Sequence, residues 1–150
     1  MSLNSFILNP ADATRILFGA SGKLSPQEFA QGIVAIMAAY IVLQFISLMP
    51  GLGLLLSFVG GLVLAFAWVC VYAKRFHDAG KSGWLAAAAV VAVLVIVIVA
   101  NVILMPVLGV NMAGGTTMPV VTVSSVLAGI ISSLVGNAVV GYFVYKMPTV

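Results

Sequence analysis

The sequence predicts an all-α integral membrane protein, a bundle of four transmembrane helices with a short N-terminal interfacial helix. Of its 150 residues, 63% are apolar and 6% are charged, whereas an average soluble domain is about 45–50% apolar and about 25% charged. The apolar residues gather into four runs, each near the roughly 20 residues that cross a bilayer. Six basic and three acidic side chains cannot cover such a core, so the excess apolar surface must face lipid.

The chain is expected to divide into an N-terminal cytoplasmic segment, residues 1–25, and a transmembrane domain, residues 26–150. In the segment, the polar stretch 9–12 (Asn-Pro-Ala-Asp) is typical of a helix start. The apolar residues after Arg15 then predict a short helix at the membrane surface. Because the first basic residue comes this late and polar residues interrupt the early apolar stretch, no cleavable secretory signal is expected.

The first span is predicted at about residues 29–49. Ser25, Pro26 and Glu28 combine a capping side chain, a proline at the first helical position and an acid three residues after the cap. This is a stronger start signal than the one in the N-terminal segment. After the span, Pro-Gly at residues 50–51 predicts a tight turn.

The other three spans are predicted at about residues 52–73, 84–105 and 121–145. The third span is rich in β-branched residues. Since it has neither alternation nor turns over this length, a spanning helix is favoured over strands. An uncharged loop, residues 106–120, is expected between the third and fourth spans.

The basic residues predict the orientation of the spans. Four spans place every basic residue on one side of the membrane and none on the other: Arg15, Lys23, Lys74, Arg75, Lys81 and Lys146. Lysine and arginine accumulate in cytoplasmic loops. Both termini and the loop between the second and third spans are therefore expected in the cytoplasm.

Small and weakly polar residues recur every four positions in the fourth span, at Ser125, Gly129, Ser133, Asn137 and Gly141. This spacing places them on one helix face, where they permit close backbone approach and hydrogen bonds between helices. The stripe predicts helix packing, either within the bundle or in self-association. The alternative is a polar permeation path, although no charged residue lies in a span to mark one; its other candidates are Gln44, Ser57 and Asn101.

The loop between the second and third spans holds five of the ten side chains that are charged or histidine. One hypothesis makes it a cationic site for an anionic lipid headgroup or for an acidic group of a partner. Its candidate residues are Lys74, Arg75, His77, Asp78, Lys81, Ser82 and Trp84.

The alternative hypothesis makes the same loop a well-capped turn that only fixes orientation and hairpin geometry. Gly80 then takes the left-handed conformation that ends a helix. Ser82 caps the next helix, and Asp78 pairs with Arg75 or with Lys81.

More specific chemistry finds little support in this loop. Gly80-Lys81-Ser82 resembles the end of a phosphate-binding loop, but that motif needs a preceding strand and a glycine where Arg75 stands. A metal site needs more ligands than His77 and Asp78. No nucleophile or partner for His77 can be identified, so neither an enzyme, a metal nor a cofactor is expected. The small, localised positive charge does not argue for nucleic acid.

Residues 75–84, Arg-Phe-His-Asp-Ala-Gly-Lys-Ser-Gly-Trp, resemble the signature of a family of small bacterial inner-membrane proteins called domain of unknown function 805. Residues 22–25 with Phe29 resemble a second block of that family, just before its first span. The family often has a basic residue where Pro26 stands, and an aromatic residue where Ala30 stands. The resemblance covers roughly residues 16–105 and implies a bacterial inner-membrane protein, without implying an activity.

The leading hypothesis is a small non-enzymatic inner-membrane protein that uses the basic hairpin 74–84. It would be an accessory or interaction subunit of a larger membrane complex, or a protein associated with anionic lipid. Two alternatives remain open. One is an oligomeric transporter or channel, and the other is a membrane-interface enzyme that uses His77 and Asp78.

Overall fold

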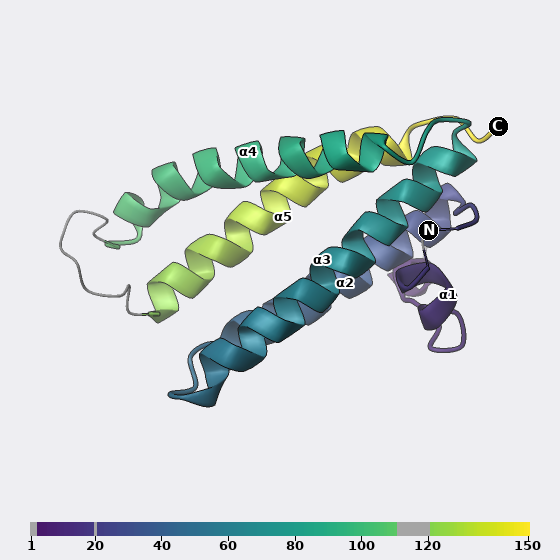
Figure 1. Ribbon diagram of the computed structural model, residues 1–150. Helices are drawn as coiled ribbons and strands as arrows, with labels where there is room; N and C mark the ends of the chain where they lie inside the picture. The colour runs from purple at the N-terminus through teal and green to yellow at the C-terminus, as the bar shows by residue number, and fades with distance from the viewer. Residues whose placement is uncertain (1–2, 20, 111–120) are drawn as a thin grey trace.

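The computed structural model describes residues 3–19, 21–110 and 121–150 (Figure 1). Four long helices, each long and apolar enough to cross a membrane, make up most of it: α2 (Pro26–Ile46), α3 (Leu52–Asp78), α4 (Leu85–Val107) and α5 (Val123–Tyr145). They are preceded by the 3-10 helix η1 (Leu3–Phe6) and by α1 (Ala13–Leu17). Within the described residues there is no strand, and the predicted all-α membrane bundle is confirmed.

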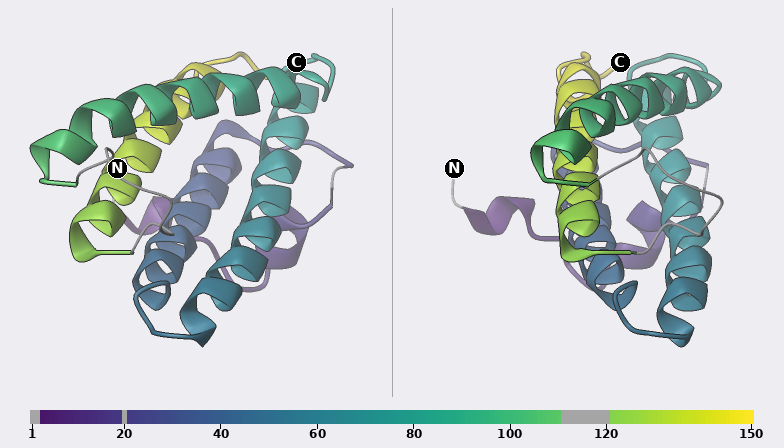
Figure 2. Two further views of the ribbon diagram at one scale, coloured as in Figure 1. Left: turned by 60° about the vertical axis from the view of Figure 1, so that its left-hand side comes forward. Right: turned by 90° about the vertical axis from the view of Figure 1, so that its left-hand side faces the viewer.

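The four long helices form two antiparallel hairpins, α2–α3 and α4–α5 (Figures 1 and 2). Helix α5 packs against α4 and also against α2. Helices α3 and α4 meet only near the loop that joins them and diverge towards their other ends, as both figures show. The bundle is therefore closed along α2 and α5 and open between α3 and α4.

All six basic residues lie at one end of the bundle, which we call the basic end. It comprises the segment before α2, the end of α3, the loop 79–84, the start of α4 and the chain after α5. Hydrogen bonds join these parts: Lys74 to α1, Arg75 to Met147 after α5, and Lys23 to Val150. Both ends of the described chain lie here (Figure 1).

Local sequence signals account for several helix ends. Ser25 Oγ accepts from Glu28 N at 3.3 Å, and Glu28 Oε2 accepts from Ser25 N at 3.0 Å, so the predicted capping box is confirmed. Gly51 and Gly80 have φ angles of 82° and 67°, a backbone conformation that favours glycine. Gly80 thus ends α3 as predicted.

Other predicted boundaries differ from the structure. Helix α2 ends at Ile46, not near residue 49, and a turn follows in which Ser47 Oγ donates to Gln44 O at 2.5 Å. Helix α3 runs past the predicted span, 52–73, to Asp78, in agreement with the helix extension to about Ala79 that Gly80 predicts. Helix α4 continues through Pro106, which lacks the amide hydrogen that would bond to the carbonyl of Val102, and ends one residue later. Residues 111–120 of the predicted loop lie outside the described residues.

Candidate functional site

The basic end is built around Arg75, whose charged side chain is fully buried. Its guanidinium donates to the Asp78 carboxylate and to the main-chain oxygens of Tyr145, at 3.2 Å, and Met147. Thr149 Oγ1 donates to the same carboxylate oxygen at 2.9 Å. A buried charge is stable only when it is paired and hydrogen-bonded. Asp78 and the chain after α5 meet that requirement, and the predicted Arg75–Asp78 pair is confirmed.

The chain after α5 crosses the end of α3 (Figure 1). Val150 N donates to Asp78 O at 2.9 Å. A β-carbon added at Gly80 would lie 3.2 Å from the Val150 side chain. The Asp-Ala-Gly stretch of the loop therefore does more than end a helix, because it also holds residues 146–150 in place.

Lys74 is also buried, at 2% exposure, and it holds α1 against α3. Its Nζ donates to the main-chain oxygens of Arg15 and Ile16, the latter at 2.7 Å. The last carbonyls of a helix lack partners within it and attract a cation. Gly32 of α2 lets Ile16 pack close to that helix. A β-carbon at Gly32 would lie only 3.1 Å from Ile16 and 3.2 Å from Val71.

His77 bridges two segments of the basic end. Its Nδ1 lies 3.3 Å from Gly22 O, in the segment before α2. A β-carbon added at Gly83 would lie only 2.6 Å from His77 Nε2. The imidazole thus fills the space beside Gly83, and the glycine permits this close approach.

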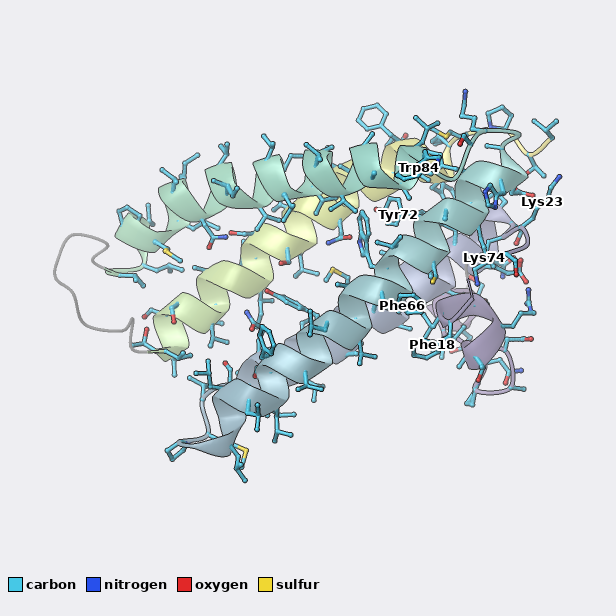
Figure 3. The ribbon with its side chains drawn as sticks, in the orientation of Figure 1. Phe18, Lys23, Phe66, Tyr72, Lys74 and Trp84 are labelled. Atoms are coloured by element: carbon cyan, nitrogen blue, oxygen red, sulfur yellow. The ribbon has the colours of Figure 1, made fainter. Side chains whose placement is uncertain are left out.

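The predicted headgroup- or partner-binding residues divide into a buried and an exposed set. Lys74, Arg75 and Asp78 are buried, and His77 is partly buried. The exposed residues are Lys81, Ser82 and Trp84. Trp84, labelled in Figure 3 at the start of α4, is 85% exposed. The prediction that Ser82 caps α4 is wrong: the cap position is Trp84 without a side-chain bond, and Ser82 Oγ accepts only from Trp84 N, at 3.4 Å.

All three acidic residues of the chain are engaged by arginines. Arg15 Nη2 lies 2.5 Å from Glu28 Oε1 and 3.6 Å from Asp12 Oδ1, and Arg75 takes Asp78. The hydrogen bond and the charge of Glu28 raise the pKa of Arg15 above its ordinary value. In the part of the chain that the structure describes, no carboxylate side chain pairs with the exposed lysines Lys23, Lys81 and Lys146.

A groove opens between α3 and α4. Near the loop 79–84 it widens into a cavity of about 700 Å³, lined by His77, Ser82 and Trp84 and then by small apolar residues of both helices. A second cavity of about 300 Å³ lies deeper, with α3 and α4 as its walls and α2 and α5 as its floor. Val69 and Val90 line both cavities, so the two form one groove.

Aromatic residues of α3 pack against α2 and α5 beside this groove. Trp68 and Tyr72 stack with ring centroids 3.9 Å apart, and Phe29 meets Tyr72 edge-on at 5.1 Å. Trp68 Nε1 donates to Asn137 Oδ1 at 2.6 Å, while Asn137 Nδ2 donates to Ser133 O at 3.0 Å. The polar groups of this pair are therefore satisfied within the bundle.

The structure places most of the predicted packing stripe between α5 and the α2–α3 hairpin. Gly129 approaches Gln44, Asn137 bonds to Trp68, and Gly141 approaches Tyr72. Ser133 contributes its carbonyl, whereas Ser125 forms a capping box with Thr122 at the start of α5.

A second small-residue stripe, at Ala128, Ser132 and Gly136, was not singled out from the sequence. All three residues are buried, and a β-carbon on Gly136 would lie 3.0 Å from Val97 of α4. The same four-residue spacing could have identified it. The docking of residues 146–150 on Arg75 has no comparable local signal.

The described residues of the basic end assemble neither a metal site nor an acid–base pair. Within the described residues, no three His, Cys, Asp or Glu side chains stand close enough together to hold a metal ion. Asp78 is occupied by Arg75 and Thr149, and His77 is held between Gly22 and Gly83.

Comparison with models of known protein families identifies a family that matches most of the chain. A family model described as a protein of unknown function, DUF805, matches residues 17–120. No curated protein and no solved structure matches the chain significantly. The matched range covers more than half of the chain and includes α2, α3, α4 and the loop with the Arg-Phe-His-Asp-Ala-Gly-Lys-Ser-Gly-Trp stretch. The chain is a small membrane protein that belongs to the DUF805 family of unknown function.

Proposed function

We propose that this protein is a non-enzymatic protein of the bacterial inner membrane that associates with anionic phospholipid through its basic end, which faces the cytoplasm. The observation that carries the proposal is the distribution of charge. All three acids pair with the two arginines, whereas Lys23, Lys81 and Lys146 are exposed and pair with no acidic side chain among the described residues. Lys23 donates only to the main-chain oxygen of Val150, at 3.5 Å.

These lysines suit a membrane surface better than a folding role. A lysine near an anionic bilayer surface contributes about 1 kcal/mol of attraction. Three of them together contribute about 3 kcal/mol, or roughly a hundredfold preference for anionic over neutral lipid.

Exposed aromatic residues at the same end support this placement. Trp84 is 85% exposed and Tyr142 is 59% exposed. Lys146 Nζ lies 5.6 Å from the centroid of the Tyr142 ring. Amphipathic rings of this kind favour the headgroup level of a bilayer, so the lysines would stand at the depth of the lipid phosphates.

The positions of His77 and Asp78 favour a non-enzymatic role. Each side chain already holds neighbouring parts of the protein together, as described above. Neither is left poised beside a nucleophile, as a general acid or base must be.

Lipid preference can be measured by native mass spectrometry of the protein from mixtures of phosphatidylglycerol and phosphatidylcholine. We expect the wild type to retain phosphatidylglycerol preferentially. Replacing Lys23, Lys81 and Lys146 by Gln should lower that preference by about tenfold or more. The matched control replaces the same lysines by Arg, which keeps the charge and should keep the preference.

Two results would overturn the proposal. One is a wild type that retains both lipids in proportion to the mixture. The other is a protein partner that copurifies in place of lipid and is lost in the Gln variant, which would favour the accessory-subunit hypothesis.

A further inference from the structure

The groove between α3 and α4 changes in polarity along its length. At its mouth it is lined by His77, Ser82 and Trp84. Beyond them, small residues such as Ala73 and Ala87 leave the space between the two helices open. The deeper cavity is lined almost entirely by apolar side chains of all four long helices.

Few polar side chains line the deeper cavity: Tyr40, Trp68, Ser133 and Asn137. Trp68 and Asn137 bond to each other at 2.6 Å, and Tyr40 Oη accepts from Gln44 at 3.0 Å. The hydroxyl hydrogens of Tyr40 and Ser133 have no acceptor among the described residues, but the rest of the lining is apolar. A buried polar group whose partners are already supplied does not select a polar ligand. The interior of the groove therefore suits hydrocarbon.

The mouth suits an anionic group. Lys81 is exposed in the loop and precedes Ser82. The Ser82 hydroxyl accepts from Trp84 N, and it has no acceptor of its own among the described residues, so its hydrogen is available to a ligand oxygen. A charged oxygen placed here would receive a hydrogen bond beside a positive charge.

The gradient of polarity along the groove favours a lipid over a helix of another protein. A phospholipid carries its charge at one end and hydrocarbon along the rest of its length. This distribution matches a groove with a polar mouth and an apolar interior.

We propose that one anionic phospholipid occupies this groove, with its phosphate beside Lys81 and Ser82 and one acyl chain between α3 and α4. The chain passes Val69 and Val90 and ends near Trp68 and Asn137. This site deepens the proposed function and rests on it, because it converts a general preference for anionic lipid into one bound molecule.

Two neighbouring alanines of α4 allow a matched test. Ala87 lines the groove, whereas Ala88, also exposed, lines neither of its cavities. Native mass spectrometry after stepwise delipidation should show one phosphatidylglycerol retained by the wild type and by Ala88→Trp. Ala87→Trp should retain it at least about tenfold less, since an indole would fill the path of the chain.

Photocrosslinking of the wild type locates the lipid without any variant. Phosphatidylglycerol with a diazirine in one acyl chain should label residues 69 and 90, and mass spectrometry of the digested protein identifies the labelled residues. Label spread evenly over the outer faces of the helices would overturn the site, as would equal retention by both tryptophan variants. So would a dimer lost only in Ala87→Trp, because a second copy would then be the occupant.

The results also separate this inference from the proposed function. If the preference for phosphatidylglycerol depends on the three lysines but not on Ala87, the lipid site in the groove is contradicted and the proposed function stands. If one lipid is retained in a way that depends on Ala87 but not on headgroup charge, the preference for anionic lipid is contradicted. The groove would then bind lipid regardless of its charge.

Discussion

Arg75 links three parts of the basic end through one guanidinium. It is fully buried, pairs with Asp78 and donates to the main-chain oxygens of Tyr145, the last residue of α5, and of Met147 after it. Breaking a buried pair by removing one partner costs about 3–5 kcal/mol, because the other charge stays buried. We expect Arg75→Gln to lower the free energy of unfolding in mild detergent by about that amount. Thermal unfolding followed by circular dichroism measures it.

Lys81→Gln is the control for this change, because it removes a positive charge from the same loop at an exposed position. It should alter stability by less than about 0.5 kcal/mol. Equal stability of the two variants would show that the buried pair does not hold the basic end together.

The surroundings of Arg75 mark the limit of sequence prediction at single residues. The three-residue spacing of Arg75 and Asp78 on one helix predicts their ion pair, and the structure confirms it. The contacts to Met147 and Thr149 join positions about seventy residues apart. No local pattern predicts them, since such contacts arise only when the bundle brings α3 and α5 together.

At the scale of helices, the glycine pair Gly60–Gly61 of α3 offers a sharp test of packing. A β-carbon on Gly60 would lie 2.6 Å from the Leu43 side chain of α2, whereas one on Gly61 meets nothing within 4 Å. Gly60→Leu should therefore force α2 and α3 apart and destabilise the protein by about 1–3 kcal/mol. Gly61→Leu is its neighbour and control, and it should leave stability unchanged or raised, because leucine forms helices better than glycine.

Thermal unfolding in detergent again reports the difference between the two glycine variants. Equal loss of stability in both would contradict the close α2–α3 contact. Equal tolerance of both would contradict it as well.

The sequence predicts the presence of the helices more reliably than the residues at which they begin and end. Length and hydropathy require four spanning helices, and the Ser25–Glu28 capping box was correctly predicted. The predicted cap at Ser82 was wrong because Trp84 takes the cap position. Choices of this kind depend on how the loop 79–84 packs against His77, which lies in the preceding helix.

For the whole molecule, the sequence predicted the number of spans but not how they pair. Apolar side chains are as compatible with lipid as with one another, so hydropathy does not reveal that α3 and α4 diverge. The opening between α3 and α4 results from the position of α5, which packs against both α4 and α2 (Figure 2). Two small residues explain those two contacts of α5, since Gly129 approaches Gln44 of α2 and Gly136 approaches Val97 of α4.

The proposed orientation, with the basic end in the cytoplasm, can be tested on the whole molecule. All basic residues lie at one end, and lysine and arginine favour the cytoplasmic side. In a Cys70→Ala background, a membrane-impermeant maleimide should label Lys81→Cys in inside-out vesicles and Met49→Cys in right-side-out vesicles. Both positions are exposed, at opposite ends of α3, and the native Cys70 is buried. The reverse pattern would place the exposed lysines on the outer face of the membrane, and the lipid groove would then open towards the outer leaflet. Labelling of both positions from the same side would contradict the spanning of α3 itself.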